Sequence, residues 1–318
     1  MRAAVTGGAG FIGSNLVDRL IAEGADVLVV DDFSSGKPSN LEKALSTGKC
    51  RLVEGDICEL DLAAAFGDFR CEVVFHLAAQ ADVRVSVRDP LDDCRTNVLG
   101  TVAVLAAAKS AGCRRVVFAS SGGTIYGEPS ELPVKEDSPQ QPLSPYGVAK
   151  KAGHDYLYYY SKVHGLSGVS LALANVYGPR QDPRGEAGVV AIFGGKMLRG
   201  ERPVIYGDGS QTRDFVFVDD VVEAFLKAVD AGEACLINIG TGVETSVLEL
   251  YSLIGDLAGF HEEPLFAPPR TGELLHISLD ITRAKEVLGW EPTVSLQEGL
   301  VRTLEWLKGS EHSDDPQK

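Results

Sequence analysis

A tyrosine and a lysine stand four residues apart in the segment SPYGVAK, as Tyr146 and Lys150. On a helix this spacing puts both side chains on one face. An ammonium group close to a phenol stabilises the phenolate and lowers the pKa of the phenol from ~10. The pair is therefore predicted to act on an alcohol or sugar hydroxyl, with Tyr146 as the general base and Lys150 as the cation that activates it.

Three hydroxyl side chains lie upstream in the segment FASSGGTIYGE (118–128), on Ser120, Ser121 and Thr124. A base that removes a proton from an alcohol benefits from a neighbouring hydroxyl that orients the reacting oxygen. Two adjacent glycines, Gly122 and Gly123, interrupt this segment. The segment is the candidate source of a third catalytic group, and the glycines leave open which residue supplies it.

A glycine-rich loop, TGGAGFIG, places Gly7, Gly10 and Gly13 after the first apolar run and at the opening of a predicted helix. Glycines there permit a tight turn and let backbone N–H groups approach a pyrophosphate. The next predicted strand ends in VVDD, where the carboxylate of Asp31 can bond ribose hydroxyls and would repel a 2′-phosphate. NAD is therefore the predicted cofactor.

Further cofactor contacts are expected beyond the carboxyl ends of the strands, where ligands of parallel sheets bind. The predicted residues are Phe11, Ile12, Asp32, Lys37, Asp56, Ile57, Leu77, Ala78, Ala79, Ser120, Tyr146 and Lys150. Asp32 and Lys37 rank below Asp31, since an exposed turn would also accommodate them. His76, at a strand end, fits a packed core position better than a metal site.

These residues must be positioned by the elements around them, and short β-branched runs alternate with helical patterns through the first half of the chain. Helices are expected at 11–23, 39–47, 59–66, 91–111 and 144–164. The alternation predicts an α/β fold with a doubly wound parallel sheet, a Rossmann fold, covered by helices on both faces.

The predicted helix at 91–111 is apolar almost all the way round. A helix that only lies on a sheet keeps one polar stripe. We therefore expect a second subunit to cover this helix in a homodimer; the alternative is a helix deep within a large core.

The chain becomes loop-rich after Asn175. We expect residues 1–174 to form an NAD-binding domain, which 213–240 rejoins. Residues 175–212 and 241–308 are expected to form a smaller, partly discontinuous substrate-binding domain. Residues 309–318 are polar and aperiodic and are expected to be a disordered tail.

The chain has 318 residues and a formal net charge of −15. This charge argues against binding to nucleic acid or to an anionic membrane surface. A strand begins almost at the first residue and no apolar run reaches 18 residues, which favours a cytoplasmic location. Six scattered cysteines without a CxxC pair favour free thiols over disulfides, and we predict no metal.

Several motifs together resemble those of the extended short-chain dehydrogenase/reductases, and within them the UDP-glucose (UDP-galactose) 4-epimerases. They are TGGAGFIGSNL, HLAAQADVRVSVRDP, NVLGT, SSGGTIYGE, SPYGVAK, NVYGPRQDP, GDGSQTRDFVFVDDV, NIGTG and RTGE. The resemblance implies a tightly held, recycled NAD and a Tyr146 that removes the proton of the sugar 4-hydroxyl. It further implies a 4-keto sugar that turns over and is reduced on its other face, so that C4 of a UDP-hexose is inverted.

The resemblance also assigns residues to the substrate. Arg213 and Arg270 would bind the diphosphate, which planar guanidinium groups suit in an acidic chain. Glu273 would bind the uridine ribose, and Asn97 would lie near the catalytic tyrosine and the cofactor. The other assigned contacts to the nucleotide sugar are Asn175, Val190 and Tyr206.

The family position of the catalytic Ser or Thr depends on how the serine segment is aligned. Counting back from Tyr126 places it on Gly122, whereas counting forward from the strand VVF places it on Ser121. Burial fixes the register of a strand while loops absorb additional residues. We therefore predict Ser121 as the catalytic hydroxyl, with Thr124 as the alternative.

Several alternatives remain at this point. The resemblance places Ile277 where family members carry the residue that gates room for a 2-N-acetyl group, and the intermediate size of Ile implies UDP-glucose and UDP-galactose with some UDP-N-acetylhexosamine turnover. Epimerisation of UDP-N-acetylhexosamine or UDP-glucuronate, or a non-catalytic NAD-binding sensor, are the other readings. Sugar-nucleotide dehydratases are disfavoured, because Gly123 and Thr124 occupy the positions of their acidic residues.

Overall fold

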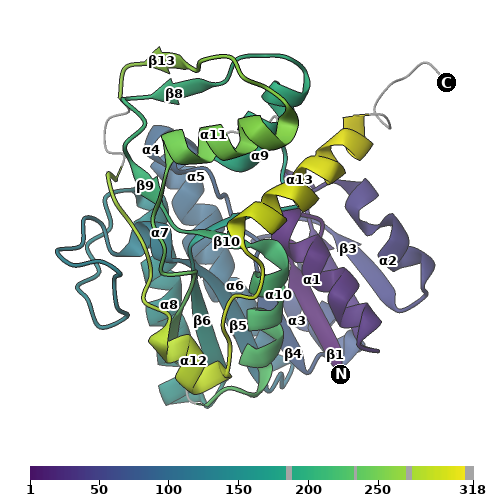
Figure 1. Cartoon of the computed structure of the whole chain (residues 1–318). Coiled ribbons are helices and arrows are strands. Elements are labelled where there is room, and N and C mark those ends of the chain that lie inside the picture. The colour runs from purple at the N-terminus through teal and green to yellow at the C-terminus, as the bar shows by residue number, and fades with distance from the viewer. Residues whose placement is uncertain (184–187, 233–234, 270–273, 312–318) are drawn as a thin grey trace.

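The computed structural model describes residues 1–183, 188–232, 235–269 and 274–311. A seven-stranded parallel sheet forms its centre, with the strand order β3-β2-β1-β4-β5-β6-β11 (Figure 1). The strands are β1 (Arg2–Thr6), β2 (Asp26–Asp31), β3 (Cys50–Glu54), β4 (Val73–His76), β5 (Arg115–Ser121), β6 (Ser167–Leu173) and β11 (Leu236–Ile239). The order reverses between β1 and β4, and in doubly wound sheets such a switch point is where the carboxyl ends of the strands form the ligand-binding crevice. The predicted doubly wound parallel sheet is confirmed.

Successive residues of the central strands enter two separate cores, as the two-residue period of a strand requires. In β1, Ala3 and Val5 join one core and Ala4 joins the other. The first core lies under α1 (Phe11–Ala22), α2 (Glu42–Ser46) and α10 (Val218–Lys227), and the second under α3 (Leu62–Phe69), α6 (Gly100–Ser110) and α8 (Pro145–His164). Both faces of the sheet are therefore covered, and its strands are apolar on both sides.

The helical stretch predicted at 91–111 is present but not uniform. It consists of α5 (Pro90–Cys94), a π-helical turn (Arg95–Leu99) and α6, and it follows the short helix α4 (Val83–Arg88). The Thr101 hydroxyl donates to the carbonyl of Asn97 within this stretch, at 2.7 Å. Single π turns inside α-helices are frequent at functional sites, because they redirect one side chain.

The chain beyond residue 174 forms short elements, several of which lie past the carboxyl ends of the main strands. Figure 1 shows β8, β13, α9 and α11 gathered there. The bounds are β7 (Asn175–Tyr177), α9 (Val189–Leu198), β8 (Val204–Tyr206), β9 (Thr212–Arg213), β10 (Phe215–Phe217), β12 (Thr245–Ser246), α11 (Val247–Ala258), β13 (Leu265–Ala267), α12 (Thr282–Leu288) and α13 (Leu296–Glu311). Helix α13 continues to Glu311, so residues 309–311 are helical and not part of a tail as we predicted; residues 312–318 lie outside the described ranges.

A buried aspartate fastens the segments that connect the sheet with these elements. The carboxylate of Asp214 is 1% exposed and accepts hydrogen bonds from the N–H groups of Thr241, Gly242 and Leu279, at 2.8, 3.0 and 3.1 Å. Its backbone carbonyl accepts from the N–H of Asn175 at 2.9 Å. None of the helices in the described ranges has the length and apolar character needed to cross a bilayer.

Candidate active site

Helix α8 brings the predicted base and its lysine together. The Ser144 side chain caps its first turn, which contains Tyr146, and Lys150 follows one turn later. The Lys150 Nζ lies 5.6 Å from the centroid of the Tyr146 ring and 5.0 Å from that of Phe118. It also donates to the carbonyl of Ala119 at 2.9 Å, so the buried ammonium is held against the end of β5.

The surroundings of this pair raise the pKa of Tyr146 and lower that of Lys150, so they favour the protonated phenol and the neutral amine. Burial raises the pKa of Tyr146, the Asp93 carboxylate adds to the rise, and the side chain of Ser121 lowers it by hydrogen bonding. Burial lowers the pKa of Lys150 to about 8, and Asp93 opposes this change. The net pKa of Tyr146 in the polypeptide alone is therefore raised and not lowered as we expected, because desolvation dominates.

The structure separates the two candidate hydroxyls. Ser121 is the last residue of β5, and its side chain is the hydrogen-bonding group that faces the Tyr146 phenol. The Thr124 hydroxyl instead lies 3.5 Å from the carbonyl of Ser121, in the short helix α7 (Gly122–Ile125). The geometry thus favours Ser121 as the third member of the site.

The two glycines have different surroundings. A Cβ on Gly122 would lie 2.5 Å from Cδ1 of Leu279 and 3.0 Å from the carbonyl oxygen of Ala172. A Cβ on Gly123 would meet only Oδ1 of Asn175, at 3.8 Å. Gly122 therefore allows α7 to pack closely on β6, whereas a Cβ on Gly123 would make only an ordinary contact with Asn175, a predicted substrate residue.

The crevice between β1 and β4 has the features of a dinucleotide site. Gly7 has φ +72°, and a Cβ there would lie 2.6 Å from the backbone nitrogen of Ala78. A Cβ on Gly13 would collide with the carbonyl of Gly7. Within the described ranges no side chain caps the amino end of α1, so the first-turn N–H groups, including those of Phe11 and Ile12, are available to an anion. These residues fit the pyrophosphate of NAD.

Asp31 ends β2 beside this crevice. Its Oδ2 accepts from the N–H of Ala9 at 2.8 Å and its Oδ1 from that of Phe33 at 2.9 Å, which fixes the carboxylate at the carboxyl edge of the sheet. Ser120, also at this edge, is buried, and its hydroxyl has no partner among the described residues. A carboxylate and an unpaired buried hydroxyl are the groups that ribose hydroxyls and an amide can satisfy.

The remaining predicted cofactor residues have varied surroundings, and some of them already bond to other side chains. The Asp32 side chain accepts from the N–H and hydroxyl of Ser34 in an exposed turn, and Lys37 pairs with Asp182 at 3.6 Å. The placements of the others are as follows: Gly10 precedes α1; Asp56 pairs with Arg95 at 2.7 Å; Ile57 is buried against Gly100; Leu77, Ala78 and Ala79 follow β4 beside Gly7; and Asn97 is 2% exposed in the π turn.

Three polar residues near the catalytic pair were not predicted. The Ser86 hydroxyl accepts from the backbone N–H of Tyr146 at 3.2 Å. Asp93 accepts from the side-chain amides of Asn97 and Gln80. Of these, Asp93 carried a usable signal, since a carboxylate four residues before Asn97 shares its helical face.

His76 is a core residue, as the sequence indicated. Its Nδ1 lies 2.7 Å from the hydroxyl of Thr6 and its Nε2 lies 3.0 Å from that of Thr101. Burial lowers its pKa to about 3, so the ring is neutral. Thr101 already donates its single proton to Asn97, so His76 must donate from Nε2 and accept at Nδ1. In the described part of the chain no group of three or more Asp, Glu, His and Cys side chains could hold a metal ion.

The described residues that we predicted to bind the substrate all belong to the chain beyond residue 174. Asn175 begins β7 and approaches Gly123, and Arg213 immediately precedes Asp214, whose carbonyl binds Asn175. Val190 is buried in α9, Tyr206 ends β8 and is 37% exposed, and Ile277 is buried among Ile125, Tyr126 and Leu279. Arg270 and Glu273 lie outside the described residues.

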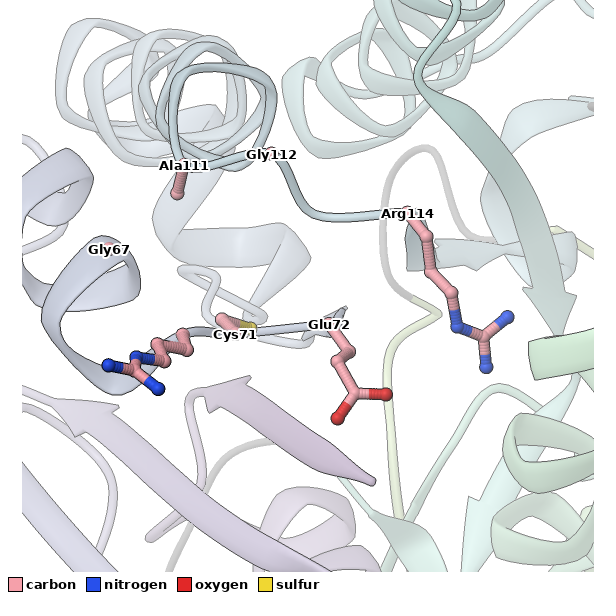
Figure 2. A pocket seen from close by; sticks show the side chains of 7 residues that line it. Gly67, Cys71, Glu72, Ala111, Gly112 and Arg114 are labelled. Atoms are coloured by element: carbon pink, nitrogen blue, oxygen red, sulfur yellow. The ribbon is translucent and has the colours of Figure 1, made fainter.

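A cavity of about 320 Å³ lies elsewhere (Figure 2). Its lining residues come from the end of α3 and from the loops before β4 and β5: Gly67, Arg70, Cys71, Glu72, Ala111, Gly112 and Arg114. Those loops are at the amino ends of the strands, opposite to Tyr146. The cavity is therefore separate from the candidate active site.

The strand order, the crevice between β1 and β4 and the Tyr-x-x-x-Lys pair at the end of β5 define an NAD-dependent enzyme of the extended short-chain dehydrogenase/reductase type. Residues 3–240 match the NAD dependent epimerase/dehydratase family, and the chain belongs to this family. The predictions of the family, of an NAD-using epimerase and of the cofactor are confirmed.

Individual relatives resemble the chain over nearly its whole length. It is 52% identical over 309 residues to the UDP-glucose 4-epimerase of Mycolicibacterium smegmatis, covering 97% of this chain and 99% of the relative. The structure of the Thermotoga maritima UDP-glucose 4-epimerase with UDP-glucose has a TM-score of 0.94 at 47% identity, covering 98% of this chain and 100% of the other. That of the Thermus thermophilus UDP-glucose 4-epimerase with NAD has a TM-score of 0.91 at 41% identity, with the same coverage.

Proposed function

We propose that this chain interconverts UDP-glucose and UDP-galactose by NAD-dependent inversion at C4 of the sugar. The observation that carries the proposal is the meeting of Tyr146, Lys150 and Ser121 at the carboxyl end of β5, beside the dinucleotide crevice. A phenol, an ammonium and a hydroxyl in this arrangement suit reversible removal of a proton from a secondary alcohol. The curated relative and the two solved structures support the same reaction.

Each residue of the site has a distinct role in this proposal. Tyr146 takes the proton of the 4-hydroxyl and later returns it, Ser121 orients the reacting oxygen, and Lys150 supplies a positive charge that favours the phenolate. When bound, oxidised NAD supplies a reversible hydride acceptor at C4 and a further positive charge near the phenol. That charge would counter the raised pKa of Tyr146, so that a larger fraction of the phenol would be ionised and able to act as the base in the holoenzyme.

The substrate side must hold a nucleotide diphosphate in a chain of net charge −15. Arg213 is the described residue that we assign to the diphosphate; it lies next to Asp214, which also fixes Asn175. Arg270 and Glu273 remain assigned to the diphosphate and the uridine ribose from the sequence alone. Val190 and Tyr206 remain our candidates for contacts to the base.

The sugar preference remains a proposal based on Ile277. Its side chain is 3% exposed and packs with Tyr126 and Leu279 beside α7. We expect UDP-glucose and UDP-galactose to be the preferred pair, with some turnover of UDP-N-acetylhexosamine. The division into an NAD-binding and a substrate-binding domain, and a cytoplasmic location, likewise remain expectations from the sequence.

We also propose that the enzyme is a homodimer. The packed helices α4, α5 and α8 and the π turn carry exposed apolar side chains. They are Val83, Val87, Leu91, Leu99, Val148, Tyr156, Tyr158, Tyr159 and Val163. Patches of this kind are rare on the free surface of monomers, and a second copy of the chain offers the same apolar helices in return.

The catalytic proposal is tested by Tyr146→Phe. The purified variant should fold and retain NAD, released on denaturation, while kcat for conversion of UDP-galactose to UDP-glucose falls at least ~10²-fold, as for loss of a positioned general base. A panel of UDP-N-acetylhexosamines and UDP-glucuronate, assayed with the unmodified enzyme, measures the sugar preference. A wild-type protein that carries NAD and converts none of these sugars would instead be a non-catalytic sensor.

A further inference from the structure

Asp93 places a carboxylate within the interior beside the catalytic pair. It lies in α5, packed against α8, and is 1% exposed. Its Oδ1 accepts from Nδ2 of Asn97 at 2.8 Å and from Nε2 of Gln80 at 3.1 Å. Both donors are neutral amides, so these bonds orient the carboxylate without neutralising its charge.

The amides that hold Asp93 are themselves fixed. Oδ1 of Asn97 accepts from the backbone N–H of Gln80 at 3.0 Å, and its Nδ2 also donates to the Gln80 carbonyl at 2.9 Å. The Asn97 carbonyl accepts from Thr101. The charge of Asp93 therefore has a fixed position relative to α8.

Among the described residues, Lys150 is the cation that faces Asp93, since the other titratable groups on the elements around α8 are neutral, engaged elsewhere or exposed. His76 of β4 is neutral, as shown above. The others are engaged elsewhere or exposed: Arg84 with Asp82, Arg95 with Asp56 and Glu59, Arg115 with Ser167 and the Gly232 carbonyl, and Arg88, Asp92 and Lys109 on the surface. Burial raises the pKa of Asp93, whereas the amides of Gln80 and Asn97 and the charge of Lys150 oppose this rise by stabilising the carboxylate.

The fixed negative charge of Asp93 acts to raise the pKa of both Lys150 and Tyr146. It favours the protonated form of Lys150 and disfavours the ionised form of Tyr146. Without it, a buried Lys150 would lose its proton at a lower pH and would no longer carry the charge that its role requires. Tyr146 would lose its proton at a lower pH as well.

We propose that Asp93 is a positioning residue of the epimerase, and that its buried charge keeps Lys150 an ammonium and sets the pH range in which the Tyr146–Lys150 pair works. This inference rests on the roles proposed above for Tyr146 and Lys150. It adds a counter-charge to the site, which neither touches the substrate nor takes up a proton in the reaction.

The test is Asp93→Asn in the NAD-loaded enzyme. Asparagine keeps the size and the acceptor oxygen for Gln80 and Asn97 while removing the charge. Both limbs of the pH profile of kcat should move to lower pH by about one unit, since each is set by a group that Asp93 holds protonated. Asp92→Asn, which removes an exposed carboxylate one residue away, should leave both limbs in place.

A second readout is independent of turnover. The tyrosinate absorbance that Tyr146 contributes is the difference between an enzyme and its Tyr146→Phe counterpart, and in Asp93→Asn this contribution should titrate at lower pH. If Asp93→Asn does not fold, Asp93→Glu and Asp93→Gln replace it as two variants of equal side-chain length that differ in charge. Both limbs of the pH profile of kcat should then lie at lower pH in the Gln variant than in the Glu variant. A loss of kcat with unmoved limbs and an unmoved tyrosinate titration would make Asp93 purely structural and overturn the proposal. If the wild type converted no UDP-sugar, the proposed function would be wrong, but the absorbance titration would still test the effect of Asp93 on Tyr146.

Discussion

The hydroxyl of Ser121 faces the Tyr146 phenol, whereas that of Thr124 lies near the Ser121 carbonyl. We expect Ser121→Ala to lower kcat by roughly one to three orders of magnitude with NAD still bound, because the reacting oxygen loses a group that orients it. Thr124→Ala is the matched control and should cost clearly less. Steady-state kinetics of the two purified variants measure the difference; the reverse order would assign the hydroxyl to Thr124.

At the scale of residues, motif spacing was sufficient to find Tyr146, Lys150 and the candidate Ser121. It did not predict the direction of the Tyr146 pKa shift, which depends on burial and on Asp93. Both depend on how closely α5 packs on α8, and a sequence shows which side chains carry charge without showing how much water surrounds them.

At the scale of elements, the junction of β5 and α7 depends on Gly122. A Cβ there would lie 2.5 Å from Leu279 and 3.0 Å from the Ala172 carbonyl. Gly122→Ala should therefore lower the free energy of unfolding by about 1–3 kcal/mol, as overpacking does in a closed core. Denaturant unfolding measures this change.

Gly123→Ala is the control for this substitution, since its Cβ would meet only Oδ1 of Asn175 at 3.8 Å. It should change the free energy of unfolding by less than about 0.5 kcal/mol. Equal effects of the two substitutions would show that the close packing of α7 on β6 is not the reason for the glycine pair.

The helix boundaries show what periodicity can and cannot provide. The stretch predicted at 91–111 occurs at 90–110, but its π turn was not predicted, because one additional residue in a turn barely changes an apolar pattern. The polar bonds of Asn97 inside the turn distinguish it from a regular helix, and they form only when the loop carrying Gln80 packs against it. The sequence therefore predicted this helical stretch correctly, but it did not predict the π turn or the polar contacts within it.

At the scale of the whole molecule, the apolar side chains exposed on α4, α5 and α8 predict a dimer. Sedimentation at micromolar protein concentration should give the mass of two chains. Leu91→Asp, at a position 83% exposed in this structure, should shift the mass toward a monomer, because a charge would be buried without a partner. Leu45→Asp on α2, outside this patch, should leave the dimer intact; a monomeric wild-type protein would refute the assignment of the patch.

The doubly wound parallel sheet and the placement of the nucleotide site at its carboxyl edge followed from the alternation of strands and helices, because right-handed crossovers allow few arrangements of a parallel sheet. The arrangement beyond residue 174 was harder to predict. Apart from β11, its strands are two or three residues long and pair with segments distant in the chain, such as β8 with β13 and β7 with β10. Periodicity over so few residues carries little information.

The buried Asp214 carboxylate joins the segments at Thr241, Gly242 and Leu279, and its own backbone holds Asn175. Releasing any one of these segments would leave a buried charge with fewer donors, which weakens the attachment of the others. The segments that Asp214 joins are thus thermodynamically coupled and should unfold with the central sheet in a single cooperative transition.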